Sequence, residues 1–148
     1  MIISASPHPT VLLVDDNHDG LLVRKSLLEE VGYCVQVAST SEEGLKLFEA
    51  TNFDVVVTDY RMPRMNGAEL IGRIRTLDPH ARVILLSGFV DPLGLTEGNT
   101  GADIVLEKNS NEAVHLVRWV KRLVNRVAPR KPPATQKTGE ARSRAAGR

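Results

Sequence analysis

The sequence has few of the features that mark secreted, membrane-bound or zinc-binding proteins. It contains one cysteine, so no disulfide can form within the chain. No apolar run is long enough to cross a membrane, and the N-terminus lacks the charged start and long apolar stretch of a signal peptide. The four histidines are dispersed without metal-ligand spacing, which argues against a zinc site. We therefore expect a cytoplasmic protein.

The composition is that of an ordinary soluble domain. Of 148 residues, 42% are hydrophobic and 25% are charged, which is enough apolar material for one packed core. The cysteine, Cys34, lies in the apolar run from Tyr33 to Val37. We expect it to be a small buried hydrophobe in a reducing compartment.

Residues 128–148 differ from the rest of the chain. They carry six basic side chains against one acidic one, a net charge of +5, whereas residues 1–127 carry −4. With three prolines and almost no large apolar side chain, this segment cannot offset its ordering entropy, and we expect a disordered basic tail. No aromatic residue interleaves the charges, so a solubilising role is favoured over contact with nucleic acid. We expect a flexible segment at 1–9 and a folded domain at 10–127.

The folded part alternates between two kinds of segment. Apolar, β-branched runs typical of strands covered on both faces occupy Thr10–Val14, Cys34–Ala38, Asp54–Thr58, Arg82–Leu86 and Ile104–Leu106. Helical spacing occupies Asn17–Val31, a segment that begins at Thr40, Ala68–Leu77 and Asn111–Val127.

Three details complete this pattern. In the first helix the expected apolar stripe is Val23, Leu27, Leu28 and Val31, and in the last it runs from Ala113 to Val127. The second helix opens with a capping-box pattern, Thr40 to Glu43. The stretch from Phe89 to Gly101 holds a proline and three glycines, so at most a short or irregular helix is expected there. The alternation predicts an α/β fold, a doubly wound sheet of five parallel strands with helices on both faces.

Polar residues gather at one edge of this predicted sheet. They follow or end four of the strands, and they are Asp15, Asp16, Asp59, Ser87 and Lys108. Ligands of open parallel sheets bind beyond the carboxyl ends of the strands, so these side chains are expected to converge.

The chemistry of this set is coherent. Three crowded carboxylates repel one another and need a cation, and hard oxygen ligands suit Mg²⁺. The metal and Lys108 would neutralise the charge of a phosphoryl transition state, and a carboxylate can accept the phosphoryl group as an aspartyl phosphate.

With these motifs the chain resembles the receiver domains of two-component response regulators, of the single-domain kind found in chemotaxis and sporulation. The resemblance rests on Val14-Asp15-Asp16, on the run from Asp59 to Gly67, on Leu85-Leu86-Ser87-Gly88 and on Gly101-Ala102-Asp103 leading to Lys108. It covers about Val11 to Val124. It implies a flavodoxin-like, three-layer α/β/α architecture.

The resemblance also implies a role for each residue. Asp59 would be the phosphoacceptor, Ser87 the switch hydroxyl and Lys108 the lysine that pairs with phosphate. Mg²⁺ would be held by Asp15, Asp16, Asp59 and the backbone carbonyl of Arg61. The donor would be a phosphohistidine of a sensor histidine kinase or phosphotransfer protein, and phosphorylation would change the binding of a downstream protein partner. A homodimer is left open, and no membrane partner is expected.

The sequence departs from the family pattern on the side that commonly signals to partners. The proline that usually follows the lysine is replaced by Asn109, so a trans loop is expected. Val105 stands where the family often has an aromatic residue. Phe89 could shield the site or pack on the surface, and Trp119 could contact a partner or cover a helix edge.

Three rival functions carry less support. An aspartyl-phosphate phosphatase would need a second carboxylate two residues after Asp59, where Arg61 stands. A DNA-binding regulator would need a module for which no room is left after residue 127. A receiver that works without phosphorylation would not need the complete acidic set. We therefore expect a signalling module and no dedicated enzyme.

Overall fold

The computed structural model describes residues 8–88 and 94–127, the side chains of residues 126 and 127 excepted. A single parallel sheet forms the centre, with the strand order β2-β1-β3-β4-β5. The strands are β1 (Thr10–Val14), β2 (Cys34–Ala38), β3 (Val55–Asp59), β4 (Val83–Ser87) and β5 (Ile104–Glu107). The predicted five-stranded parallel sheet is confirmed.

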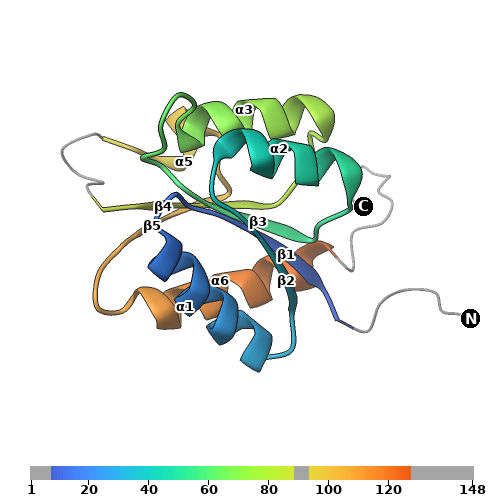
Figure 1. Cartoon of the computed structure of the whole chain (residues 1–148), viewed down its shortest axis with the longest axis vertical. Helices are drawn as coiled ribbons and strands as arrows, with labels where there is room; N and C mark the ends of the chain where they lie inside the picture. Colours follow the sequence, from blue (N-terminus) through green and yellow to red (C-terminus); the bar gives the residue numbers. More distant parts are fainter. Residues whose placement is uncertain (1–7, 89–93, 128–148) are drawn as a thin grey trace, which may run out of the picture.

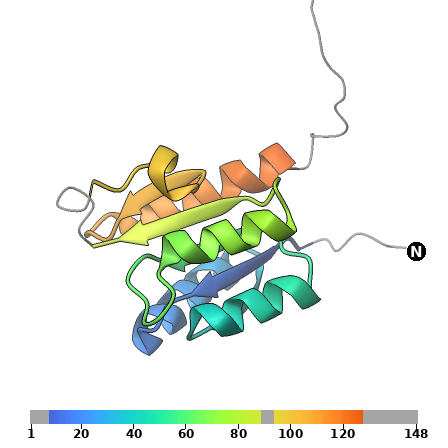
Figure 2. The same ribbon diagram turned by 90° about the horizontal axis from the view of Figure 1, so that it is seen from above.

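Helices cover both faces of this sheet. They are α1 (His18–Glu30), α2 (Ser41–Ala50), α3 (Gly67–Leu77), α5 (Glu97–Thr100) and α6 (Glu112–Val127). The helices α1 and α6 pack on one face, and α2, α3 and α5 lie over the other (Figure 1). Seen from above, α3 lies between α2 and α5 (Figure 2). The result is the expected three-layer α/β/α arrangement.

The core is divided by the sheet into two clusters. Neighbouring residues of a strand point to opposite faces, so Leu13 packs in the cluster under α1 and α6, whereas Leu12 packs in the cluster under α2 and α3. Every residue of β3 and β4 is buried, because these central strands are covered on both sides. This explains why their sequences read as continuous apolar runs.

The helices begin where side chains can cap them. Asn66 and Glu69 form a complete capping box at the start of α3. At the start of α2 the predicted box is only half formed. Thr40 accepts a hydrogen bond from the amide of Glu43, but the Glu43 carboxylate accepts from the amide of Ser39, one residue before the expected partner.

Two predictions about burial are wrong. Of the stripe predicted for the first helix, Leu28 is buried as expected, but Val23 and Val31, the residue after α1, are 67% and 51% exposed, and Leu21 is the other buried position. Cys34 is exposed because β2 is an edge strand and Cys34 is its first residue. In α6 the predicted face is buried at Leu116, Val120 and Leu123, whereas Ala113 at its start is exposed.

The glycine-rich stretch forms one turn of helix, α5, as expected. Phe89, the tail 128–148 and residues 1–7 lie outside the described residues, so the expectations for them are not tested. Among the described residues, none of the helices has the length and apolar character needed to span a bilayer. Trp119 is partly buried against the α1–α6 cluster, with the Arg122 guanidinium carbon 5.0 Å from its ring centre.

Candidate functional site

The strand order reverses between β1 and β3. The chain passes from β1 to β2 on one side and then crosses back to β3 on the other, so the carboxyl ends of β1 and β3 face a shared crevice. Asp15 directly follows β1, and Asp59 is the last residue of β3. The fold therefore places the predicted acidic residues together.

The three aspartates form one cluster. One carboxylate oxygen of Asp15, Asp16 and Asp59 lies within 4.8 Å of an oxygen of each of the other two. Asp15 and Asp59 are buried, with exposures of 2% and 5%, whereas Asp16 is exposed. Three carboxylates at this spacing fit a hard divalent cation such as Mg²⁺, which takes oxygen ligands and keeps several waters.

Lys108, the residue after β5, joins the cluster. Its ammonium lies 2.6 Å from an oxygen of Asp59 and 3.6 Å from Oδ2 of Asp15. Its own backbone amide donates to the carbonyl of Ser87 at 2.9 Å, which ties the start of the β5–α6 loop to the end of β4. The structure thus confirms that Asp15, Asp16, Asp59 and Lys108 lie close together, as predicted.

The carboxyl group of Asp59 is electrostatically unusual. Burial raises its pKa above the ordinary value, the hydrogen bond from Lys108 opposes this rise, and the nearby charge of Asp15 adds to it. The net direction is upward, even with a lysine in contact. Burial is the largest cause of this rise, so removal of Asp59 from water outweighs the contact with Lys108.

The loop after Asp59 is held close to the sheet. A Cβ on Gly67 would lie against the carbonyl oxygen of Asp59 and 2.9 Å from the Cα of Tyr60, so only glycine allows this approach. The buried hydroxyl of Ser41, at the start of α2, donates to the carbonyl of Met65 at 2.7 Å. These contacts fix the loop that carries Arg61.

Comparison with known proteins gives the family of this chain. The model of the response regulator receiver domain matches residues 11–119, most of the chain and all five strands except the first residue of β1. The chain belongs to this family. It is a receiver domain of the kind found in response regulators of two-component systems.

Individual receiver domains agree in sequence and in shape. A response regulator receiver protein of Anaeromyxobacter sp. (strain Fw109-5) is 39% identical over 79 residues, which is 53% of this chain and 33% of that protein. The receiver domain protein of Clostridium thermocellum superposes with a TM-score of 0.73 at 34% identity, over 81% of this chain and 97% of that one.

A third relative was solved with a metal and a phosphoryl analogue. The response regulator TrrA of Thermotoga maritima, in complex with Mg(2+)-BeF, gives a TM-score of 0.71 at 33% identity, over 78% of this chain and 98% of that one. By contrast, this receiver domain matches between 9% and 33% of the length of the first curated relatives.

The switch residue Ser87 and two departures from the family pattern, at Val105 and Asn109, can be placed in the structure. Ser87 is buried at the end of β4, beside the strand of Asp59. Val105 is partly buried on the α2–α3 side of the sheet, and no cis peptide bond occurs among the described residues, so the loop at Asn109 is trans as predicted. Arg61 is exposed, and the role of its carbonyl remains a prediction.

Two residues of the site were missed in the sequence. Arg24, on α1, donates to Oδ2 of Asp15 at 2.8 Å, and Glu112, the first residue of α6, binds Arg24. A signal for Arg24 existed, because it lies three residues after Leu21 and four before Leu28, on the stripe that faces the sheet. For Glu112, the sequence contains no comparable sign.

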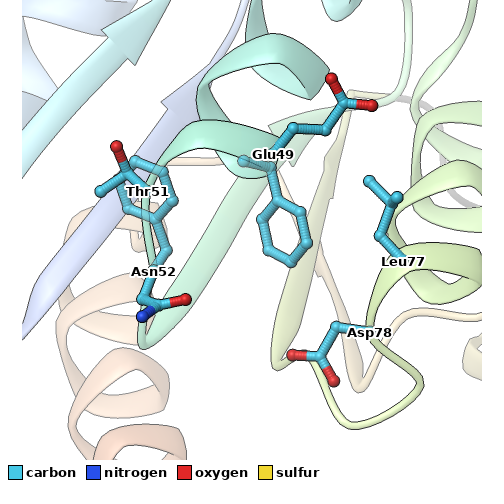
Figure 3. A pocket seen from close by; sticks show the side chains of 7 residues that line it. Glu49, Thr51, Asn52, Leu77 and Asp78 are labelled. Atoms are coloured by element: carbon cyan, nitrogen blue, oxygen red, sulfur yellow. The ribbon is translucent and has the colours of Figure 1, made fainter.

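Another pocket lies at the opposite end of the sheet. It is bounded by the ends of α2 and α3, and Figure 3 shows Glu49, Thr51, Asn52, Leu77 and Asp78 around it. Its acids, Glu49 and Asp78, have no lysine, arginine or histidine among the pocket's lining residues. This pocket therefore lacks the pairing of acids with a lysine that is found at the carboxyl ends of the strands.

Proposed function

We propose that this receiver domain accepts a phosphoryl group on Asp59, with Mg²⁺ bound by Asp15, Asp16, Asp59 and the backbone carbonyl of Arg61. The observation that supports this most directly is the environment of Asp59. Its carboxylate is buried, contacts the Lys108 ammonium at 2.6 Å and belongs to a cluster of three aspartates.

The transfer forms one bond and breaks one bond. A carboxylate oxygen of Asp59 attacks the phosphorus of a phosphohistidine on a sensor histidine kinase or phosphotransfer protein, and the bond between phosphorus and the imidazole nitrogen breaks. The imidazole leaves with the electron pair of that bond. The metal, when bound, would neutralise charge on the phosphoryl oxygens.

Lys108 and Ser87 act on the product in this proposal. Lys108 pairs with a phosphoryl oxygen, and its contact with Asp59 already holds it within reach. Ser87, at the end of the neighbouring strand, would donate its hydroxyl to another phosphoryl oxygen. A shift of Ser87 would then move the end of β4 and change the surface that a downstream protein partner binds.

The experiment is incubation with a small-molecule phosphodonor and Mg²⁺, followed by intact-mass measurement. We expect wild type to gain one phosphoryl group and Asp59→Asn to gain none. Asp54→Asn is the matched control, because Asp54 directly precedes the same strand at its other end. Phosphorylation of Asp59→Asn at the wild-type level would refute the proposal.

Lys108→Gln gives a graded test of the same site. Loss of one charged contact to the transferring group should slow phosphorylation roughly 100-fold while the domain stays folded. Size-exclusion chromatography of the phosphorylated and unphosphorylated wild type then reports whether the oligomeric state changes with phosphorylation.

A further inference from the structure

Arg24 is a largely shielded cation of α1 that pairs with the first residue of α6. Its side chain is 11% exposed, and its guanidinium donates from Nε and Nη2 to the two carboxylate oxygens of Glu112, at 2.6 and 3.2 Å. Its Nη1 donates to Asp15 at 2.8 Å. The two acids raise the pKa of Arg24 although burial opposes that rise, so the cation stays charged.

Both carboxylate oxygens of Asp15 already have partners within the protein. Oδ1 accepts a hydrogen bond from the backbone amide of Asn17 at 2.9 Å. Oδ2 faces both the Arg24 guanidinium at 2.8 Å and the Lys108 ammonium at 3.6 Å. A divalent cation that approaches Asp15 therefore meets a guanidinium already in contact with the same carboxylate.

The charges around the site show what this contact does. Within this set of contacts, four acids, Asp15, Asp16, Asp59 and Glu112, face two cations, Arg24 and Lys108. Arg61 lines a pocket with Asp16 and stands outside this set, in which the acids outnumber the cations. Removing Arg24 would increase this excess of acids and free an oxygen of Asp15, whereas neutralising Glu112 would reduce the excess and leave Asp15 as the only anionic partner of Arg24.

We propose that Arg24, clamped by Glu112, is a positioning residue that orients Asp15 and competes with the divalent cation for it. The ion pair between α1 and α6 thereby sets the metal affinity of the phosphoacceptor site. This inference rests on the proposed function and adds to it a control on metal binding from outside the acidic cluster. Glu112 weakens the competition by sharing the guanidinium with Asp15.

The test is the dissociation constant of Mg²⁺, measured by calorimetric titration without phosphodonor. We expect Arg24→Gln to bind Mg²⁺ roughly tenfold more tightly than wild type, because a repelling charge next to the metal is removed. We expect Glu112→Gln to bind it several-fold more weakly, roughly three- to tenfold. Arg24→Lys, which keeps the charge but loses the forked contact, should lie between wild type and Arg24→Gln.

Arg75→Gln is the control. Arg75 also pairs with an aspartate, Asp103, but it lies at the other end of the sheet, so its loss should leave the Mg²⁺ affinity within about twofold. If Arg24 had only a structural role, Arg24→Gln and Glu112→Gln would change the thermal stability but leave the dissociation constant of Mg²⁺ as in wild type.

The outcomes separate this inference from the proposed function. Unchanged or weaker Mg²⁺ binding in Arg24→Gln would overturn the inference alone, and so would tighter binding in Glu112→Gln. If Arg24→Gln does not fold, Glu112→Gln decides, because that side chain lies at the start of α6 and its substitution preserves shape. Absence of Mg²⁺ binding by wild type would overturn the metal site of the proposed function and this inference with it.

Discussion

The acidic residues at the two ends of the sheet have different surroundings. At the amino ends of the strands, Asp54 accepts from the amide of Thr10 at 2.8 Å, and Asp103 accepts from the amide of Val83 at 2.7 Å and from Arg75 at 3.1 Å. These acids complete the hydrogen bonding of strand ends. At the carboxyl ends, three acids lie within 4.8 Å of one another, and burial and the charge of Asp15 raise the pKa of Asp59.

This difference in surroundings implies a difference in what the acids contribute to stability. Acids at the amino ends stabilise the fold, because each satisfies a backbone amide that would otherwise lack a partner. Acids at the carboxyl ends lie close to one another, an arrangement that the proposed Mg²⁺ would relieve. The same residue type should therefore give opposite results when it is replaced at the two ends.

The largest expected effect is at the amino end. Asp103→Ala should destabilise the domain by about 2 to 3 kcal/mol, because it leaves the partly buried amide of Val83 and the guanidinium of Arg75 without this acceptor. Urea unfolding followed by circular dichroism measures the change. A loss below about 0.5 kcal/mol would show that this acid contributes little to the fold.

Mg²⁺ should act only at the carboxyl end. At a concentration ten times the dissociation constant it should stabilise wild type by about 1.4 kcal/mol, and chelation should remove this gain. Asp103→Ala should show the same gain from its lower baseline, whereas Asp59→Asn should show much less. Equal gains in all three proteins would place the metal elsewhere.

The pH dependence of Asp59→Asn sharpens the comparison further. Because the folded-state pKa of Asp59 is raised, the ionised carboxylate costs stability, and this cost is absent below the ordinary aspartate pKa of about 3.9. This cost in stability grows as the pH rises toward the raised folded-state pKa of Asp59, and it is constant above that pKa.

In a chelator, Asp59→Asn should therefore be more stable than wild type at neutral pH, by at most about 1 kcal/mol because the amide also gives up the ion pair with Lys108. The difference should shrink toward acid pH. Asp54→Asn, measured alongside, should be less stable than wild type. A stability difference for Asp59→Asn that is independent of pH would contradict the raised pKa.

The smallest expected effect concerns the loop at the carboxyl end. Arg64 has a φ of 69°, the left-handed region that disfavours residues with a Cβ, and its side chain contacts Glu42 at 3.4 Å. Arg64→Gly and Arg64→Ala both remove that contact, and the glycine variant should be more stable than the alanine variant by about 1 kcal/mol. Thermal unfolding of the two variants tests whether the loop is strained at this position. Equal unfolding midpoints would show that it is not.

Much of the site could be anticipated because its residues follow strands. The apolar runs before Asp15, Asp59 and Ser87 define strand ends within one residue, and parallel strands bring those ends to one edge. Resemblance to receiver domains supplied the individual roles. The placement of Asp15, Asp16, Asp59 and Lys108 in one cluster followed from this reasoning.

The errors arose where burial depends on distant elements. The stripe of the first helix was predicted from apolar spacing alone, but α1 turns Leu21 and Leu28 inward, and Arg24 between them pairs with Asp15 and Glu112. Cys34 was expected to be buried because its neighbours are apolar, but the strand order leaves β2 at the edge. The strand order and the contact of Arg24 with Glu112, 88 positions away, both join segments that are far apart in the sequence.

Local pattern alone thus determined the strands, the helices and the edge of the sheet where polar residues end the strands, because side-chain periodicity and capping act over a few residues. Only the tertiary structure decided that Glu112 meets Arg24 across 88 positions of sequence and that Arg24 meets Asp15. The physical reason is that a charge shielded from water is stable only where the fold brings partners to it, and one partner of Arg24, Glu112, comes from a helix that is distant in the sequence.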